Sequence, residues 1–335
     1  MSFFAILFAL LIEQVRPLGA HNPIHTGLRV WARWVSSNFD AGKPQHGWVS
    51  WLLAVVMPAL LALGIHWALL ATLGWPAAMV WSVLVLYVTL GFRQFSHHFT
   101  AIRDALESGD EQRARELLAQ WQRVDASELP RSEIVRHVIE FSVLAAHRHV
   151  FGVLAWFSVL AALGLGPAGA VLYRMAEFVA RYWRYRSRMQ LQPASEALQS
   201  AAARAWTAVD WLPARITAIA FAVVGSFEEA IDCWRNYAQR FPNDNDGVIL
   251  AATSGAVNVR LGGEALKPVF APSASQPFQA EAAASIGAEA PADTASTPGR
   301  EAEVAHLRSI VGLVWRSVVL WMVLLALLTL ARLLG

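Results

Sequence analysis

The stretch from Val49 to Leu73, VSWLLAVVMPALLALGIHWALLATL, decides the fold class of this chain. It contains no Asp, Glu, Lys or Arg. A helix needs roughly 20 apolar residues to cross a bilayer core about 30 Å thick, and this stretch is long enough. Pro58 interrupts it, but a membrane helix tolerates proline where neighbouring helices satisfy the freed carbonyl. The stretch therefore predicts a transmembrane helix.

The composition of the whole chain is that of a membrane protein. Of its 335 residues, 56% are hydrophobic and 16% are charged, and the mean hydropathy is +0.40. A water-soluble surface of this size needs more charge. The net charge of +2, with only two lysines, argues against a nucleic-acid-binding protein. The single cysteine, Cys233, excludes an internal disulfide and a cysteine-based metal site within one chain.

Further apolar runs predict about five or six membrane helices in total. Gly74-Trp75-Pro76 marks a tight turn, after which Ala77 to Phe92 returns across the membrane. The other candidate spans are Ser2 to Val15, Val150 to Gly166, Trp206 to Phe227 and Ser317 to Leu334. Charged residues inside Ser2 to Val15 and inside Trp206 to Phe227 leave open whether these two segments cross the membrane fully. Arginines interleaved with aromatic residues at 178–188 predict an interfacial helix.

Polar segments divide the spans. Helical spacing at 93–136 predicts soluble helices, residues 228–266 predict a second folded extramembrane part, and the Ala/Ser/Pro-rich stretch 267–304 predicts a disordered linker. The predicted divisions are N-terminal membrane helices 1–92, a cytoplasmic helical segment 93–136, membrane helices 137–227, the extramembrane segment 228–266, the linker 267–304 and a C-terminal membrane helix 305–335. The predicted fold is an all-α polytopic membrane bundle with two extramembrane helical segments.

Arginine distribution predicts the orientation. The stretches 93–148 and 174–204 are rich in Arg, whereas the turn at Gly74 to Pro76 has none. Because Lys and Arg are enriched in cytoplasmic loops, both basic stretches should lie in the cytoplasm. We expect a multi-pass protein of the bacterial inner membrane that contacts lipid.

Charged residues near or within apolar runs are the candidate functional groups. The chain has no P-loop, HExxH, nucleophile elbow or dinucleotide glycine motif. Arg136 and Glu140, four residues apart, can pair on one helix face. Asp210 and Arg215 lie inside an apolar stretch, where ionisable residues mark either a site or an internal pair. Arg260 lies beside a glycine pair, which either offers amides to a phosphate or simply makes a turn.

Several motifs together resemble one known family. They are Asn22-Pro23-Ile24-His25, residues 109–115 (GDEQRAR), residues 133–136 (EIVR) with Ile139-Glu140, residues 166–170 (GPAGA), residues 210–218 (DWLPARITA) and residues 256–263 (AVNVRLGG). In order and spacing they resemble the CobD/CbiB membrane proteins of cobalamin biosynthesis. The resemblance covers most of residues 1–265.

The resemblance implies a reaction and a set of site residues. The reaction is ATP-dependent attachment of aminopropanol, or its phosphate ester, to a carboxylate of adenosylcobyric acid, which gives cobinamide. It implies a corrinoid substrate, with ATP and Mg²⁺, and no protein-held metal site is predicted. The implied catalytic residues are Asp125, Glu140 and Asp210, and the implied substrate- or phosphate-binding residues are Arg123, Arg215, Asn258, Arg260, Gly262 and Gly263. We expect Glu140, Asp210, Arg215 and Arg260 to share one water-accessible pocket.

Departures from the family pattern support an alternative. Several acidic residues that the pattern implies are absent, since Val143 to His149 contains Ala145, Ala146 and Arg148 and no acid. This argues against full ligase activity. The chain also resembles AmpE, a membrane protein linked to β-lactamase induction, through residues 18–21 (LGAH), 181–186 and 209–213 (VDWLP). The alternative function is therefore a non-enzymatic membrane sensor or regulator.

Overall fold

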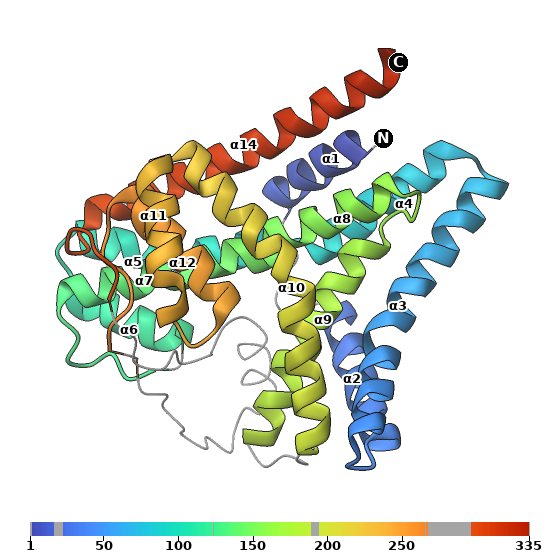
Figure 1. Ribbon diagram of the computed structural model, residues 1–335, viewed down its shortest axis with the longest axis horizontal. Coiled ribbons are helices and arrows are strands. Elements are labelled where there is room, and N and C mark those ends of the chain that lie inside the picture. The colour runs from blue at the N-terminus through green and yellow to red at the C-terminus, as the bar shows by residue number, and fades with distance from the viewer. Residues whose placement is uncertain are drawn as a thin grey trace. The chain divides into compact units, whose positions relative to one another are not determined.

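The computed structural model describes residues 2–16, 23–122, 124–188, 194–264, 266 and 296–334. Across these residues every regular element is a helix, and Val259 and Arg300 form an isolated bridge between extended segments. Figure 1 shows the helices in chain order. The predicted all-α class is confirmed.

The chain divides into two compact units, and each is described by itself. The first unit comprises Met1–Phe92, Arg148–Pro213 and Leu325–Gly335. In it, α3 packs against α2, α4 and α9, and α1 packs against α4 and α8. The helices of this unit are α1 (Ser2–Val15), α2 (Pro23–Phe39), α3 (Pro44–Thr72), α4 (Trp75–Thr89), α8 (Gly152–Ala162), α9 (Ala168–Arg188) and the first part of α10 (Glu196–Val224).

The second unit comprises Arg93–His147 and Ala214–Leu324. Here α12 packs against α11 and α7, and α6 also packs against α7. The elements of this unit are α5 (Phe92–Glu107), α6 (Glu111–Gln122), α7 (Arg131–Ala146), the rest of α10, α11 (Phe227–Tyr237), the short η2 (Ala238–Arg240), α12 (Asp244–Val257) and most of α14 (Val304–Leu334).

Four helical runs among the described residues are long and apolar enough to cross a membrane. They are Pro44–Thr72, Arg131–Ala162, Glu196–Val224 and Val304–Ala331. The apolar helices Ser2–Val15 and Trp75–Thr89 are shorter. The protein is therefore a multi-pass membrane protein, as predicted. The span predicted from Val150 begins earlier, because α7 continues through a π-helical turn into α8.

The helical ladder is irregular at two of the points where the chain passes between units. One lies at His147, where the π-helical turn η1 (His147–Phe151) joins α7 to α8. The other lies at Pro213, inside α10. A π turn changes the i→i−4 hydrogen-bond pattern, and proline lacks an N–H. Both boundaries therefore coincide with weakened backbone hydrogen bonding.

The predicted linker is too long at its C-terminal end. Residues 267–295 of that prediction lie outside the described residues. Thr297 donates its backbone N–H to the Leu261 carbonyl at 2.7 Å, and the Arg300 carbonyl accepts the N–H of Arg260 at 2.7 Å. These backbone bonds place the segment after residue 296 in the folded part of the second unit, which composition alone does not reveal.

The contact between α8 and α9 depends on a glycine. A Cβ atom added to Gly169 would lie 2.1 Å from the Trp156 carbonyl oxygen, whereas one added to Gly64 of α3 would meet nothing within 4 Å. The backbones of α8 and α9 therefore approach more closely at Gly169 than any other residue permits.

Replacing this glycine should destabilise the first unit. We expect Gly169→Ala to lower the free energy of unfolding by about 1–3 kcal/mol, because the new methyl group must push two backbones apart. The control Gly64→Ala should raise the free energy of unfolding by less than about 1 kcal/mol, because alanine has a higher helix propensity than glycine. Thermal unfolding of the detergent-solubilised protein measures both. Equal midpoints for the two variants would contradict the close packing.

His98 should make the second unit sensitive to acid. Its ring stacks on Trp121 with centroids 5.8 Å apart, and burial, followed by the neighbouring His97, lowers its pKa from the ordinary value of 6.5. The unfolded chain therefore takes up a proton before the folded chain does. Stability should be full above about pH 6.5, fall below it, and level off below the folded-state pKa. Between pH 7.5 and pH 5, the thermal unfolding midpoint of His98→Gln should fall less than the midpoint of the wild-type protein.

Candidate functional site

A cluster of ionisable side chains lies on one face of α7. Glu133 lies three residues before Arg136 and four before His137, and Glu140 lies four after Arg136 and three after His137. Side chains at these spacings neighbour one another on the helix surface. Arg136 donates from Nη1 to Glu140 Oε1 at 3.0 Å and from Nε to Glu133 Oε2 at 2.9 Å. The side chains of Arg136 and Glu140 are only 5% and 6% exposed. The predicted Arg136–Glu140 pair is confirmed, and it is buried.

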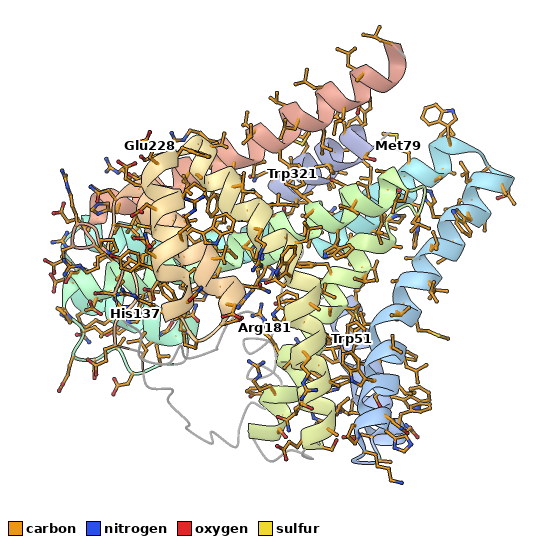
Figure 2. The ribbon with its side chains drawn as sticks, in the orientation of Figure 1. Trp51, Met79, His137, Arg181, Glu228 and Trp321 are labelled. Carbon is orange, nitrogen blue, oxygen red and sulfur yellow. The ribbon has the colours of Figure 1, made fainter. Side chains whose placement is uncertain are left out.

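His137 completes the cluster. It is 1% exposed, with its Nε2 3.9 Å from Glu133 Oε2 and its Nδ1 3.6 Å from Glu140 Oε2. Figure 2 labels it on the ribbon of the second unit. Neither His137 nor Glu133 was predicted as a site residue. The three-residue spacings from Glu133 to Arg136 and from His137 to Glu140 were the available signal.

The loop after α12 docks on this cluster. Residues 258–264, here called the glycine loop, follow α12, which ends at Val257. The first of them, Asn258, caps the helix with a left-handed φ of 52°. The Gly262 N–H donates to Glu140 Oε1 at 2.7 Å. Arg136 Nη2 donates to the Glu264 carbonyl at 2.8 Å. Two segments far apart in sequence are thus joined by buried hydrogen bonds to charged groups, which are stronger than neutral ones.

The backbone conformation of this loop requires glycine at two adjacent positions. Gly262 and Gly263 have φ values of 80° and 123°, which side chains rarely permit. A Cβ at Gly263 would lie 3.8 Å from the Arg136 guanidinium carbon, which is an ordinary van der Waals distance, so the φ value and not a lack of space requires glycine there. The pair therefore makes a turn, and that turn directs one amide at Glu140.

Arg260 lies in the same loop but points to solvent. Its side chain is exposed, while its backbone N–H donates to the Arg300 carbonyl. Glu140, in contrast, is buried and its Oε1 accepts bonds from Arg136 and Gly262. The expectation that Glu140 is water-accessible is therefore wrong, because groups from its own helix and the glycine loop replace water around it.

Asp210 and Arg215 belong to different units, although they flank Pro213. Asp210 is 1% exposed and accepts a hydrogen bond of 2.8 Å from the Tyr173 hydroxyl, within the first unit. Arg215 donates from Nη1 to Asn245 Oδ1 at 3.1 Å, within the second unit. Each has a local polar partner, which fits the alternative of internal pairs. Neither is joined to the Glu140 cluster by these bonds.

The remaining predicted site residues lie elsewhere. Asp125 is exposed, and its Oδ1 accepts bonds from the Ser127 N–H at 3.1 Å and hydroxyl at 2.7 Å, as in a polar turn. Arg123 lies outside the described residues. Of the nine predicted residues, the structure therefore joins Glu140 directly to Gly262 and brings Gly263 beside its partner Arg136. A group of three or more His, Cys, Asp or Glu side chains able to hold a metal is not found among the described residues.

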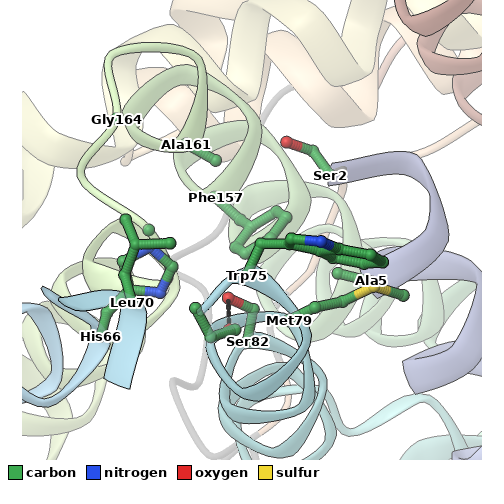
Figure 3. A pocket seen from close by; sticks show the side chains of 12 residues that line it. Ser2, Ala5, His66, Leu70, Trp75, Met79, Ser82, Phe157, Ala161 and Gly164 are labelled. Carbon is green, nitrogen blue, oxygen red and sulfur yellow. Dashed lines mark hydrogen bonds between the residues drawn. The ribbon is translucent and has the colours of Figure 1, made fainter. Parts of the chain in front are cut away.

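A separate hollow of about 220 Å³ lies in the first unit between α1, α3, α4 and α8. In Figure 3 the side chains of His66, Trp75, Met79 and Phe157 surround it. Its lining contains no charged residue and none of the predicted site residues. It therefore suits an apolar group, such as part of a lipid chain, and not the phosphate chemistry that the sequence predicts.

Comparison with known proteins decides the family. The family described as "CobD/Cbib protein" matches residues 3–288. The chain belongs to the CobD/CbiB family. It is 30% identical over 329 residues to the cobalamin biosynthesis protein CobD of Stutzerimonas stutzeri, covering 96% of each chain. It is 36% identical over 183 residues to CobD of Chromobacterium violaceum, covering 55% of each chain.

A CobD protein from another organism matches a shorter part of this chain. CobD of Mycobacterium tuberculosis is 30% identical over 194 residues, covering 56% of this chain and 58% of its own length. No solved structure matches the chain. These relatives carry the CobD name, and the AmpE resemblance remains a prediction from sequence.

Breaking the buried ion pair should destabilise the CobD/CbiB chain strongly. Arg136→Met leaves the Glu140 carboxylate buried without its guanidinium, which should lower the free energy of unfolding by about 3–5 kcal/mol. Arg136→Met combined with Glu140→Leu should recover part of this loss, because no buried charge remains. Urea unfolding in detergent measures these changes.

A matched control comes from an exposed pair. On α6, Arg113 Nη1 lies 3.3 Å from Glu116 Oε2, and both side chains are about half exposed. Arg113→Met should change stability by about 0–1 kcal/mol. If Arg136→Met is no worse than Arg113→Met, the glycine loop is held by other contacts.

Proposed function

We propose that this protein acts in cobalamin biosynthesis. The observation that carries the proposal is its similarity over 96% of both chains to a protein named cobalamin biosynthesis protein CobD. The Glu140 cluster and the glycine loop lie within the residues that match the family. We propose that the protein acts in the inner membrane of a bacterium, where it contacts lipid.

The proposed reaction joins aminopropanol, or its phosphate ester, to a carboxylate of adenosylcobyric acid to give cobinamide. For amide formation, ATP first transfers a phosphate group to the carboxylate, and the amine of aminopropanol then displaces this phosphate. The site must keep water away from the activated acyl group. It also requires cations that hold phosphate oxygens. Guanidinium groups bind phosphate through parallel hydrogen bonds, so an exposed arginine on a fixed loop is well suited.

Arg260 is the strongest candidate for this role. Its exposed guanidinium lies two residues before Gly262, whose amide is fixed on Glu140 at 2.7 Å. We assign the buried Arg136–Glu140 pair the task of anchoring this loop. Glu140 therefore anchors the loop, and we assign no catalytic role to Asp125 or Asp210, whose observed contacts are with Ser127 and Tyr173.

The described residues do not fit a Mg²⁺ ion held by the protein alone. Glu140 Oε1 is already engaged by Arg136 and Gly262, and Asp125 Oδ1 by Ser127. Mg²⁺ in nucleotide-dependent enzymes takes ligands from phosphates, water and one or two carboxylates. We propose that ATP-bound Mg²⁺, if the reaction uses it, arrives with its nucleotide.

Complementation tests the proposal. A strain that lacks this gene should make little corrinoid unless cobinamide is supplied, and the wild-type gene should restore synthesis. Arg260→Ala should reduce restored corrinoid at least about tenfold, because one charge-assisted contact to an anion is lost. Arg113→Ala, which removes another exposed arginine, on α6, should restore it fully. Protein amounts in the membrane fraction are compared by immunoblot.

Normal corrinoid content in the deletion strain would overturn the proposed function. Altered β-lactamase induction in that strain, with corrinoid unchanged, would instead favour the regulator predicted from the AmpE resemblance.

A further inference from the structure

Residues 297–300, here called the strap, hold the glycine loop at residues next to the one that Glu140 binds. Val259 pairs with Arg300 in a parallel bridge. The Arg260 N–H donates to the Arg300 carbonyl at 2.7 Å, and the Arg300 N–H donates to the Asn258 carbonyl at 3.3 Å. The strap therefore fixes the backbone on both sides of Val259.

Thr297 is the centre of this contact. Its backbone N–H donates to the Leu261 carbonyl at 2.7 Å, and its hydroxyl oxygen accepts the Leu261 N–H at 2.8 Å. The Ser254 hydroxyl donates to the same oxygen at 2.7 Å. Thr297 is 2% exposed and Ser254 is fully buried. Water cannot readily replace these bonds, so losing the hydroxyl leaves a buried amide unpaired.

The strap fits against the loop without space for a side chain. Gly299 has a φ of 135°, and a Cβ there would lie 2.8 Å from the Val259 carbonyl carbon. A glycine is needed both for this backbone conformation and for the close approach. The contact is thus specific to the sequence Thr297-Pro298-Gly299-Arg300.

Two clamps therefore act on adjacent residues. Thr297 holds Leu261, and Glu140 holds Gly262. From Asn258 to Gly263 the loop contains three residues with positive φ, and the conformational entropy lost when such a backbone becomes ordered opposes binding. Contacts that order the loop beforehand remove this penalty when a ligand arrives.

We propose that Thr297 is a positioning residue of the CobD/CbiB site: its hydroxyl holds the Leu261 amide so that the exposed Arg260 and the Gly262–Gly263 turn are preorganised for a phosphate-bearing ligand. This inference rests on the proposed function. Thr297 touches no reacting group, and its effect passes through Leu261 to the loop.

The test compares three threonine variants. Thr297→Val keeps the shape but removes the hydroxyl, Thr297→Ser keeps the hydroxyl, and Thr72→Val is the control. Thr72 is exposed, and its hydroxyl donates only along α3, to the Ala68 carbonyl at 2.7 Å. Each full-length protein is measured for hydrogen–deuterium exchange of the 258–264 amides in detergent and for restored corrinoid in the deletion strain.

Thr297→Val should accelerate exchange of the Leu261 and Gly262 amides about tenfold or more, since a buried hydrogen bond is worth about that factor in an equilibrium constant. It should lower corrinoid by a similar factor at wild-type membrane abundance. Thr297→Ser should restore both, and Thr72→Val should change neither.

Other outcomes overturn the inference. Unchanged exchange in Thr297→Val would show that the hydroxyl does not hold the loop. Faster exchange with full corrinoid synthesis, while Arg260→Ala still abolishes it, would remove the positioning role and leave the proposed function standing. If the wild-type gene itself fails to restore corrinoid, the proposed function fails, and with it the role of the strap in that function.

Discussion

The described site depends on one interaction, the buried ion pair between Arg136 and Glu140. Neither charge is stable in a water-poor interior unless it has partners, because desolvation of an ion costs several kcal/mol. The partners come partly from α7 itself and partly from the backbone of the glycine loop. The same bonds that make the charges tolerable therefore bring together segments more than a hundred residues apart. Satisfying the two buried charges and holding the glycine loop on α7 are therefore achieved by the same hydrogen bonds.

The pair also explains why a helix with membrane-spanning length carries so many ionisable groups. The run Arg131–Ala162 is apolar over most of its length, and its charged residues are concentrated in the first turns. Long apolar segments hold ionisable residues only where these face other protein groups. In this chain Arg136 bonds to Glu133 and Glu140, and the glycine loop bonds to Arg136 and Glu140, so these charges have protein partners in place of lipid.

Sequence reasoning predicted the helical membrane class, the family and the main spans, because these follow from local composition and ordered motifs. Val49 to Leu73 is apolar throughout, and no tertiary contact is needed to recognise it. The Arg136–Glu140 pair was also visible, since four-residue spacing is a local property. The attachment of Gly262 to Glu140 was not, because the sequence contains no signal for which distant amide a carboxylate accepts. Likewise, composition placed Thr297 in a linker, and only its contacts with Ser254 and Leu261 reveal that it belongs to the fold.

The strap has a further consequence for how chains of this kind can vary. Leu266 is buried on one side, and Thr297 is fixed on the other, by contacts within the second unit. Substitutions should therefore be tolerated less well at Thr297 and Gly299, where a buried hydrogen bond and a positive φ fix the backbone, than at exposed positions of α14.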